Sequence, residues 1–139
     1  MARLAGPEGV EFTHQLGIET ARNTEGECVM ELLLEGRHMS RAERAHGGVL
    51  FTMLDTAMGR AVISRLPEGQ GCATLEAKIN FLRPIQHGRI RATGRLLDMT
   101  RRTAYAEGTL TDADGRVLAR ASGTFFLTET MQQAERERV

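Results

Sequence analysis

A chain of 139 residues is long enough to form one domain with a sizeable hydrophobic core. Hydrophobic residues make up 41% of it and charged residues 26%, which is typical of globular proteins. Lys and Arg together number 18, as do Asp and Glu, so the net charge gives no reason to expect binding to nucleic acid or to an anionic membrane. We expect a single domain over residues 1–139, with flexible ends at about 1–9 and 130–139.

The sequence also disfavours membrane, secreted and metal-binding proteins. The longest nearly apolar run, residues 49–63, is interrupted by polar residues and cannot span a membrane. The first residues lack the apolar segment of a signal peptide, so the cytoplasm is the expected compartment. The four histidines and two cysteines lack metal-ligand spacing, and Cys28 and Cys72 are expected to be free thiols on strands. We expect no metal and no bound cofactor.

The first part of the chain contains two strand patterns and a loop. Residues 12–20 fit a short lead-in followed by a first strand, and residues 27–35 alternate as a half-buried strand does. Residues 36–45 are polar and irregular, which is typical of a loop, and they lead directly into His46-Gly47-Gly48.

Residues 47–66 follow a helical pattern. Apolar residues recur at steps of three and four, at Leu50, Met53, Leu54, Ala57, Met58 and Ala61. At about 100° per residue, small and polar residues form one narrow stripe on another part of the surface: Gly48, Thr52, Asp55 and Gly59. Pro67, Gly69 and Gly71 are expected to end the helix.

Four strand patterns follow the helix, over residues 72–82, 88–98, 102–111 and 116–128. Asp112-Ala113-Asp114-Gly115, between the last two, is a hairpin-turn signal. The last three segments lie too close together in the sequence for crossover helices, so they should pair antiparallel. One helix and about six strands predict an α+β fold in which an antiparallel sheet wraps over the helix.

The start of the helix suggests a chemistry. A helix N-terminus offers unpaired N–H groups and partial positive charge, and glycine at Gly47 and Gly48 lets a ligand approach the backbone closely. Burying the carboxylate of Asp55, two turns further on, is costly, so this residue is expected to have a binding partner or a functional role. Oxyanion donors together with a carboxylate favour acyl-transfer chemistry. The alternatives are a solvated helix face for Asp55, and a helix cap or a core histidine for His46.

Six short segments stand out between about residues 12 and 127: Leu16-Gly17-Ile18, His46-Gly47-Gly48, Leu54-Asp55, Phe81-Leu82-Arg83-Pro84, Asp114-Gly115-Arg116 and Gly123-Thr124-Phe125. In these segments the chain resembles hotdog thioesterases of the phenylacetate-degradation type. The resemblance implies a hotdog fold, an antiparallel sheet of five to six strands wrapped around one long central helix. It also implies hydrolysis of acyl-CoA thioesters with aryl or short- to medium-chain acyl groups. Coenzyme A then enters only as part of the substrate, and no metal is required.

The same resemblance assigns roles by position. Gly47 matches the residue whose N–H polarises the thioester carbonyl, and Asp55 matches the general base or nucleophile. Thr74 matches a Ser/Thr position that helps to hold the water, and His46 is a candidate for fixing the loop or the substrate oxygen. Ser40 stands where relatives usually carry an Asn that supports the oxyanion site, and Ser is shorter and has no amide donor.

The CoA part of the substrate carries phosphates, so its contacts are expected to be basic. Arg83, and Arg101 with Arg102 on a loop between late strands, are candidates for the CoA phosphates because the planar guanidinium suits phosphate. Solvated loop arginines are the alternative. Gly48 is a further candidate contact. The acyl pocket is expected along the helix and a subunit interface, at Leu50, Phe51, Leu54 and Met58.

One helix cannot bring both reactive groups to one carbonyl. Gly47 and Asp55 are separated by a rise of about 12 Å at 1.5 Å per residue, and an aspartate side chain reaches only a few ångströms. A two-fold dimer with antiparallel helices places Gly47 of one subunit against Asp55 of the other and creates two equivalent sites. We expect an obligate homodimer, which can pair into a tetramer. The alternatives are a hotdog hydratase and a weakly active or non-catalytic acyl-CoA-binding protein.

Overall fold

The structure, a computed structural model, describes residues 11–129. The expected flexible ends, at about 1–9 and 130–139, lie outside this range. The elements follow in the order α1 (Phe12–Gln15), β1 (Glu19–Thr24), β2 (Glu27–Leu33), the 3-10 turn η1 (Gly36–His38), α2 (Gly47–Ile63), β3 (Gly71–Phe81), β4 (Arg89–Met99), β5 (Thr103–Thr111) and β6 (Val117–Thr128).

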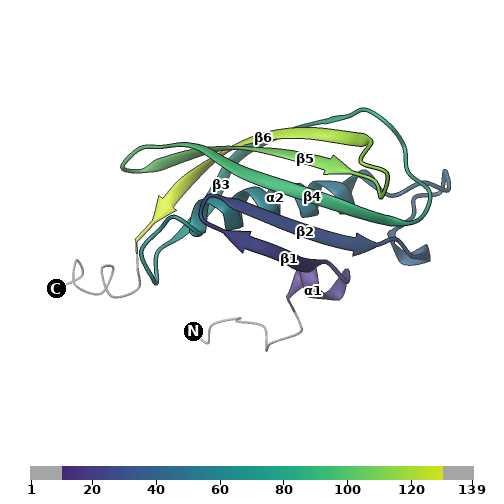
Figure 1. Ribbon diagram of the computed structural model, residues 1–139, viewed down its shortest axis with the longest axis horizontal. Coiled ribbons are helices and arrows are strands. Elements are labelled where there is room, and N and C mark those ends of the chain that lie inside the picture. The colour runs from purple at the N-terminus through teal and green to yellow at the C-terminus, as the bar shows by residue number, and fades with distance from the viewer. Residues whose placement is uncertain (1–10, 130–139) are drawn as a thin grey trace.

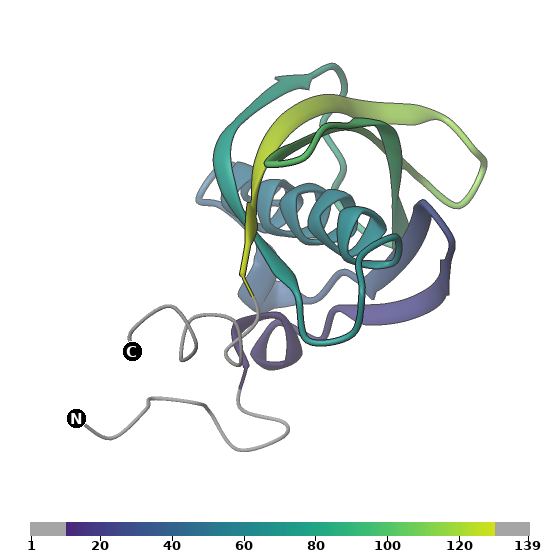
Figure 2. The ribbon, with the colours of Figure 1, turned by 90° about the vertical axis from the view of Figure 1, so that its left-hand side faces the viewer.

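The strands form one six-stranded sheet in the order β1-β2-β4-β5-β6-β3. Every neighbouring pair is antiparallel. The sheet curves around α2, whose axis runs along the concave side (Figures 1 and 2). The predicted α+β architecture, with the sheet wrapped over a single long helix, is therefore confirmed.

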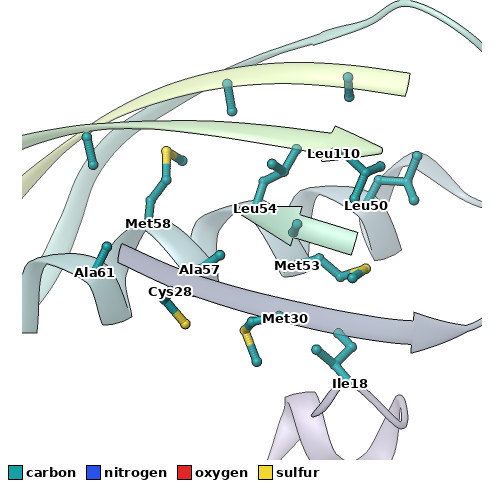
Figure 3. Packing of buried hydrophobic residues seen from close by; sticks show 14 of the residues in the cluster. Ile18, Cys28, Met30, Leu50, Met53, Leu54, Ala57, Met58, Ala61 and Leu110 are labelled. Carbon is teal, nitrogen blue, oxygen red and sulfur yellow. The ribbon is translucent and has the colours of Figure 1, made fainter. Parts of the chain in front are cut away.

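The predicted apolar face of α2 forms the centre of the core. Leu50 is 4% exposed, and the other five predicted positions are fully buried. Figure 3 shows these side chains directed into the core from α2, with Cys28, Met30 and Leu110 on the facing strands. The helix lies against β4 at Gly94, where an added Cβ would be 2.4 Å from the main chain of Ala57. Only a glycine allows this close approach.

The start of the sheet differs from the expectation. Residues 12–15 form a short helix, and the first strand begins at Glu19 and continues to Thr24. Gly17, with a φ of +78°, separates the two elements. All six residues of β1 are exposed, so no alternation of apolar residues could mark this strand. It pairs with β2 through a turn at Gly26, which has a φ of +79°.

The predicted hairpin between β5 and β6 is confirmed. The Asp112 carboxylate accepts hydrogen bonds from the N–H groups of Asp114 and Arg116, and Gly115 has a φ of +82°. Both cysteines are free, Cys28 buried on β2 and Cys72 half-buried on β3, as predicted. Neither α1 nor α2, the α-helices within residues 11–129, is long and apolar enough to cross a membrane.

Candidate active site

His46 caps the N-terminus of α2. Its Nδ1 accepts a hydrogen bond of 2.8 Å from the N–H of Gly48, and its carbonyl accepts one of 3.0 Å from the N–H of Val49. The interpretation of His46 as a helix cap is thus confirmed. The N–H of Gly48, expected among the substrate contacts, is taken by the cap. Among the described residues, the Gly47 N–H has no hydrogen-bond partner, so this donor is open at the positive end of the helix.

A pocket of about 340 Å³ lies beside Gly47. Leu50 and Phe81 are among its apolar lining residues, and Arg44 and Arg83 supply positive charge. A Cβ added to Gly47 would lie 3.3 Å from the Phe81 ring, so the ring covers one side of this glycine. The volume is at the lower end of the range for small-molecule sites. Phe81 was part of the motif in the sequence analysis, but nothing in its spacing indicated that it would line a pocket.

Asp55 and Thr74 meet between α2 and β3. The Thr74 hydroxyl donates a hydrogen bond of 2.8 Å to Oδ1 of Asp55. Thr74 pairs with the buried Phe125 of β6, and this register directs its side chain toward the helix. Asp55 is half-buried. Two residues predicted separately from the sequence are therefore direct neighbours.

Cys72, which the sequence indicated only as a free thiol on a strand, lies next to this pair. Burial raises the pKa of the Cys72 thiol, and the negative charge of Asp55 raises that pKa further. Its Sγ lies 3.6 Å from the carbonyl oxygen of Gly59. A Cβ at Gly59 would be 3.5 Å from Phe125, an ordinary van der Waals contact, so Gly59 lies on a side of α2 that faces the sheet.

Two predicted acyl-pocket residues belong to the core instead. Leu54 and Met58 are fully buried and directed toward the sheet (Figure 3). They pack beneath Gly108 of β5, where an added Cβ would be 3.0 Å from Leu54 and 3.4 Å from Met58. The predicted pocket position Leu50 does line the pocket beside Gly47. An apolar helix residue has the same sequence signature in a core and in a pocket, so the pattern could not separate them.

Ser40 stabilises a turn. Its hydroxyl accepts a hydrogen bond of 3.3 Å from the N–H of Ala42, and its N–H donates to the carbonyl of Arg44 at 2.7 Å. No hydrogen bond between Ser40 and Gly47 occurs within residues 11–129. In this chain, the hydroxyl organises the loop before α2, and a contact of Ser40 with the substrate oxygen stays a prediction.

The predicted phosphate-binding arginines lie at opposite ends of α2. Arg83 lines the pocket beside Gly47, and its Nη1 donates a hydrogen bond of 2.7 Å to the carbonyl of Val117. Arg101 and Arg102 are exposed on the loop before β5. The far end of β5 reaches Leu50, near the helix N-terminus, through Leu110 (Figure 3). The loop that carries Arg101 and Arg102 therefore lies beside the C-terminal part of the helix.

Comparison with known proteins places these features in a family context. The family model described as "Thioesterase superfamily" matches residues 43–119. A Saccharolobus solfataricus protein named as an esterase is 28% identical over 120 residues, which are 86% of this chain and 85% of the relative.

Two solved structures have the same fold. A hypothetical thioesterase of Streptococcus pneumoniae, solved with coenzyme A, is 27% identical with a TM-score of 0.75, covering 81% of this chain and 90% of that one. The structures of that protein include variants in which a threonine or an aspartate is replaced by alanine. An asparagine-to-aspartate variant of the phenylacetic acid degradation protein PaaI of Thermus thermophilus is 27% identical with a TM-score of 0.76, covering 83% and 96%.

Proposed function

The chain belongs to the thioesterase superfamily and is a thioester hydrolase with the hotdog fold; from that premise, we propose that it hydrolyses acyl-CoA esters with aryl or short- to medium-chain acyl groups. The observation that carries the proposal is the Gly47 N–H, which has no partner among the described residues and opens beside a pocket at the start of α2. The neighbour solved with coenzyme A and the PaaI neighbour support this substrate class.

In the proposed mechanism, the Gly47 N–H binds the thioester carbonyl oxygen. Negative charge develops on this oxygen when the carbonyl is attacked, and the positive end of α2 stabilises it. The His46 cap occupies the neighbouring N–H of Gly48, so a single donor of the first turn is directed at the substrate. The acyl group then lies in the pocket against Leu50 and Phe81.

Asp55 supplies the base or the nucleophile. The Thr74 hydroxyl holds Oδ1, which leaves Oδ2 to accept a proton from water. Water adds to the carbonyl carbon, the C–S bond breaks, and the CoA thiolate leaves and receives the proton. In the nucleophilic variant, the carboxylate attacks first and water then hydrolyses the mixed anhydride. Both routes give the free acid and CoA without a metal.

The reaction centre is shared between two subunits in this proposal. Gly47 and Asp55 are about 12 Å apart along α2, which is too far for both to contact one carbonyl. Strand β3, which carries Thr74, is an edge strand, and its side of the molecule exposes Leu75 (60%), Phe81 (54%) and Leu82 (53%). An uncovered edge with large apolar side chains is typical of an interface. A second copy with its helix antiparallel covers this edge and completes two sites.

The same arrangement gathers the basic residues. Antiparallel helices bring the C-terminal part of one α2 beside the N-terminus of the other. Arg101 and Arg102 of one subunit then lie at the same end of the interface as Arg83 of the second. The CoA phosphates bind between these guanidinium groups, whose planar donors suit them.

Release of free thiol from a panel of acyl-CoA esters tests the proposal. The panel includes phenylacetyl-, benzoyl-, butyryl- and octanoyl-CoA, and a thiol dye reports the CoA. Asp55→Asn should lower turnover by roughly 10²- to 10⁴-fold, the range for a lost general base, and leave CoA-ester binding intact. Glu76→Gln, at an exposed carboxylate on β3, the strand that carries Thr74, is the matched control. Full turnover by Asp55→Asn would exclude the role of Asp55, and substrate consumption without free thiol would indicate a hydratase.

A further inference from the structure

His38 is the one polar residue that is fully buried among residues 11–129. It lies in η1, ahead of the loop that leads to α2. Burying an imidazole is costly unless its nitrogen atoms are hydrogen-bonded. Neither the sequence patterns nor the proposed mechanism gives this residue a role.

Both ring nitrogens of His38 are satisfied in a defined way. Nδ1 accepts a hydrogen bond of 2.9 Å from the backbone N–H of Glu35. The ring proton is therefore on Nε2, which lies 2.7 Å from the carbonyl oxygen of Leu16 and donates to it. The neutral side chain thus ties the η1 turn to the segment that follows α1.

The main chain of His38 reaches the helix cap directly. Its carbonyl accepts a hydrogen bond of 2.8 Å from the N–H of His46. His46 in turn caps α2 through Gly48 and directly precedes Gly47. The intervening residues 40–44 are exposed or half-buried and form a turn of their own. Ala45, directly before His46, is also buried, and its N–H donates a hydrogen bond of 2.8 Å to the carbonyl of Ile85. The start of α2 therefore has two attachments on this side, and the bond to His38 is the one that the cap residue itself makes.

We propose that His38 is a positioning residue, which orients the Gly47 N–H by fixing the carbonyl to which the cap residue is bound. This inference rests on the proposed function for its kinetic consequence. The bond from Glu35 to Nδ1 sets the η1 turn and hence the direction of the His38 carbonyl. A displacement there moves His46 and rotates the first turn of α2. An oxyanion donor loses much of its effect when it is misplaced by a fraction of an ångström to 1 Å.

Two substitutions separate the two ring bonds. In His38→Asn, the amide oxygen takes the place of Nδ1 and keeps the bond from Glu35. In His38→Gln, the amide nitrogen takes the place of Nε2 and keeps the bond to Leu16 instead. We expect His38→Gln to lower kcat about tenfold with KM within about twofold, the pattern of a lost transition-state contact. His38→Asn should stay within about threefold of the native kcat. His87→Gln, at an exposed histidine, is the control.

The amide resonances of Gly47 and Gly48 give a readout that needs no substrate. They should shift in His38→Gln, and much less in His38→Asn and His87→Gln. If the native protein hydrolysed no thioester, the proposed function would fail, whereas these resonances would still decide the role of His38. Unchanged resonances and kcat in His38→Gln, or equal losses in both variants, would overturn the inference. Loss of the folded state in either variant would also overturn it, because His38 would then serve stability alone.

Discussion

Two variants that are each inactive should restore activity to one another when their subunits mix. The first is Asp55→Asn. The second is Gly47→Pro, which removes the one N–H assigned to the substrate oxygen. Proline is favoured at the first position of a helix, and the preceding His46 has the extended ψ of 133° that a residue before proline prefers. Loss of this donor should lower kcat by about 10²- to 10³-fold.

The expected recovery follows from the two-fold arrangement. A hybrid dimer has one site that lacks both groups and one site with an intact Gly47 and an intact Asp55. Random mixing of equal amounts gives half hybrids, so total activity should return to roughly a quarter of the native value. The two chains are unfolded together in urea, refolded and assayed by thiol release, and hybrids isolated with two tags should reach about half.

A complete site within one subunit would give a different result. Every subunit of the hybrid would then lack one group, and no activity would return on mixing. Gly47→Ala serves as the control for the proline. It keeps the N–H and adds a Cβ that lies 3.3 Å from the Phe81 ring, a contact that a small movement of this exposed side chain relieves. It should keep most of the activity.

Three further predictions concern stability and charge. Gly94→Ala would place a Cβ 2.4 Å from the main chain of Ala57, so it should lower the free energy of unfolding by about 3 kcal/mol or more in urea titrations. The control is Gly36→Ala, which has open space around it and should change the free energy of unfolding by less than about 0.5 kcal/mol. Asp55→Asn removes a charge that raises the pKa of Cys72, so iodoacetamide should alkylate Cys72 faster at pH 8 than in the native protein, and Glu76→Gln should leave that rate unchanged. The hydrogen bond from Arg22, with a further one from Arg95, lowers the pKa of Glu27 from its ordinary value of 4.5. The folded-state pKa is thus below the unfolded one, so the stabilisation is present above pH 4.5 and is lost as the pH falls through the folded value. Glu27→Gln should cost less than about 1 kcal/mol at pH 7 and nothing in stronger acid, and an equal cost at both pH values would contradict this assignment.

The elements with strong local patterns could be predicted from the sequence. The apolar face of α2 repeats at helical spacing, and the residues it contains are those that the sheet buries. The turn at Asp112 is specified by its own carboxylate and by Gly115. The strand order could not be predicted, because α2 connects β2 to β3, and β4, β5 and β6 lie between these two strands in the sheet. No local sequence pattern indicates that β3 pairs with β6.

The part of the candidate site that lies in the motif at the start of α2 could be predicted from the sequence. His46, Gly47 and Asp55 lie on one helix, so their relative placement follows from helix geometry. The contact between Asp55 and Thr74 depends on the register of β3 against β6, which is a tertiary property. Leu54 and Met58 were expected in the acyl pocket because an apolar helix residue has the same sequence pattern in a pocket and in a core, whereas the structure buries both beneath the sheet. The functions assigned to the other site residues stay predictions.

The position of β3 determines when the reaction centre forms. Within residues 11–129, its one neighbour in the sheet is β6, the last of the described strands in the order of synthesis. While the ribosome is still extending the chain toward residue 117, α2 can be helical and β4 and β5 can pair, but Thr74 has no strand to lie against. The hydroxyl reaches Asp55 only when contacts distant in sequence close, and such contacts form late and slowly. This hydrolase should therefore emerge as an inert nascent chain and acquire its chemistry in the final step of folding.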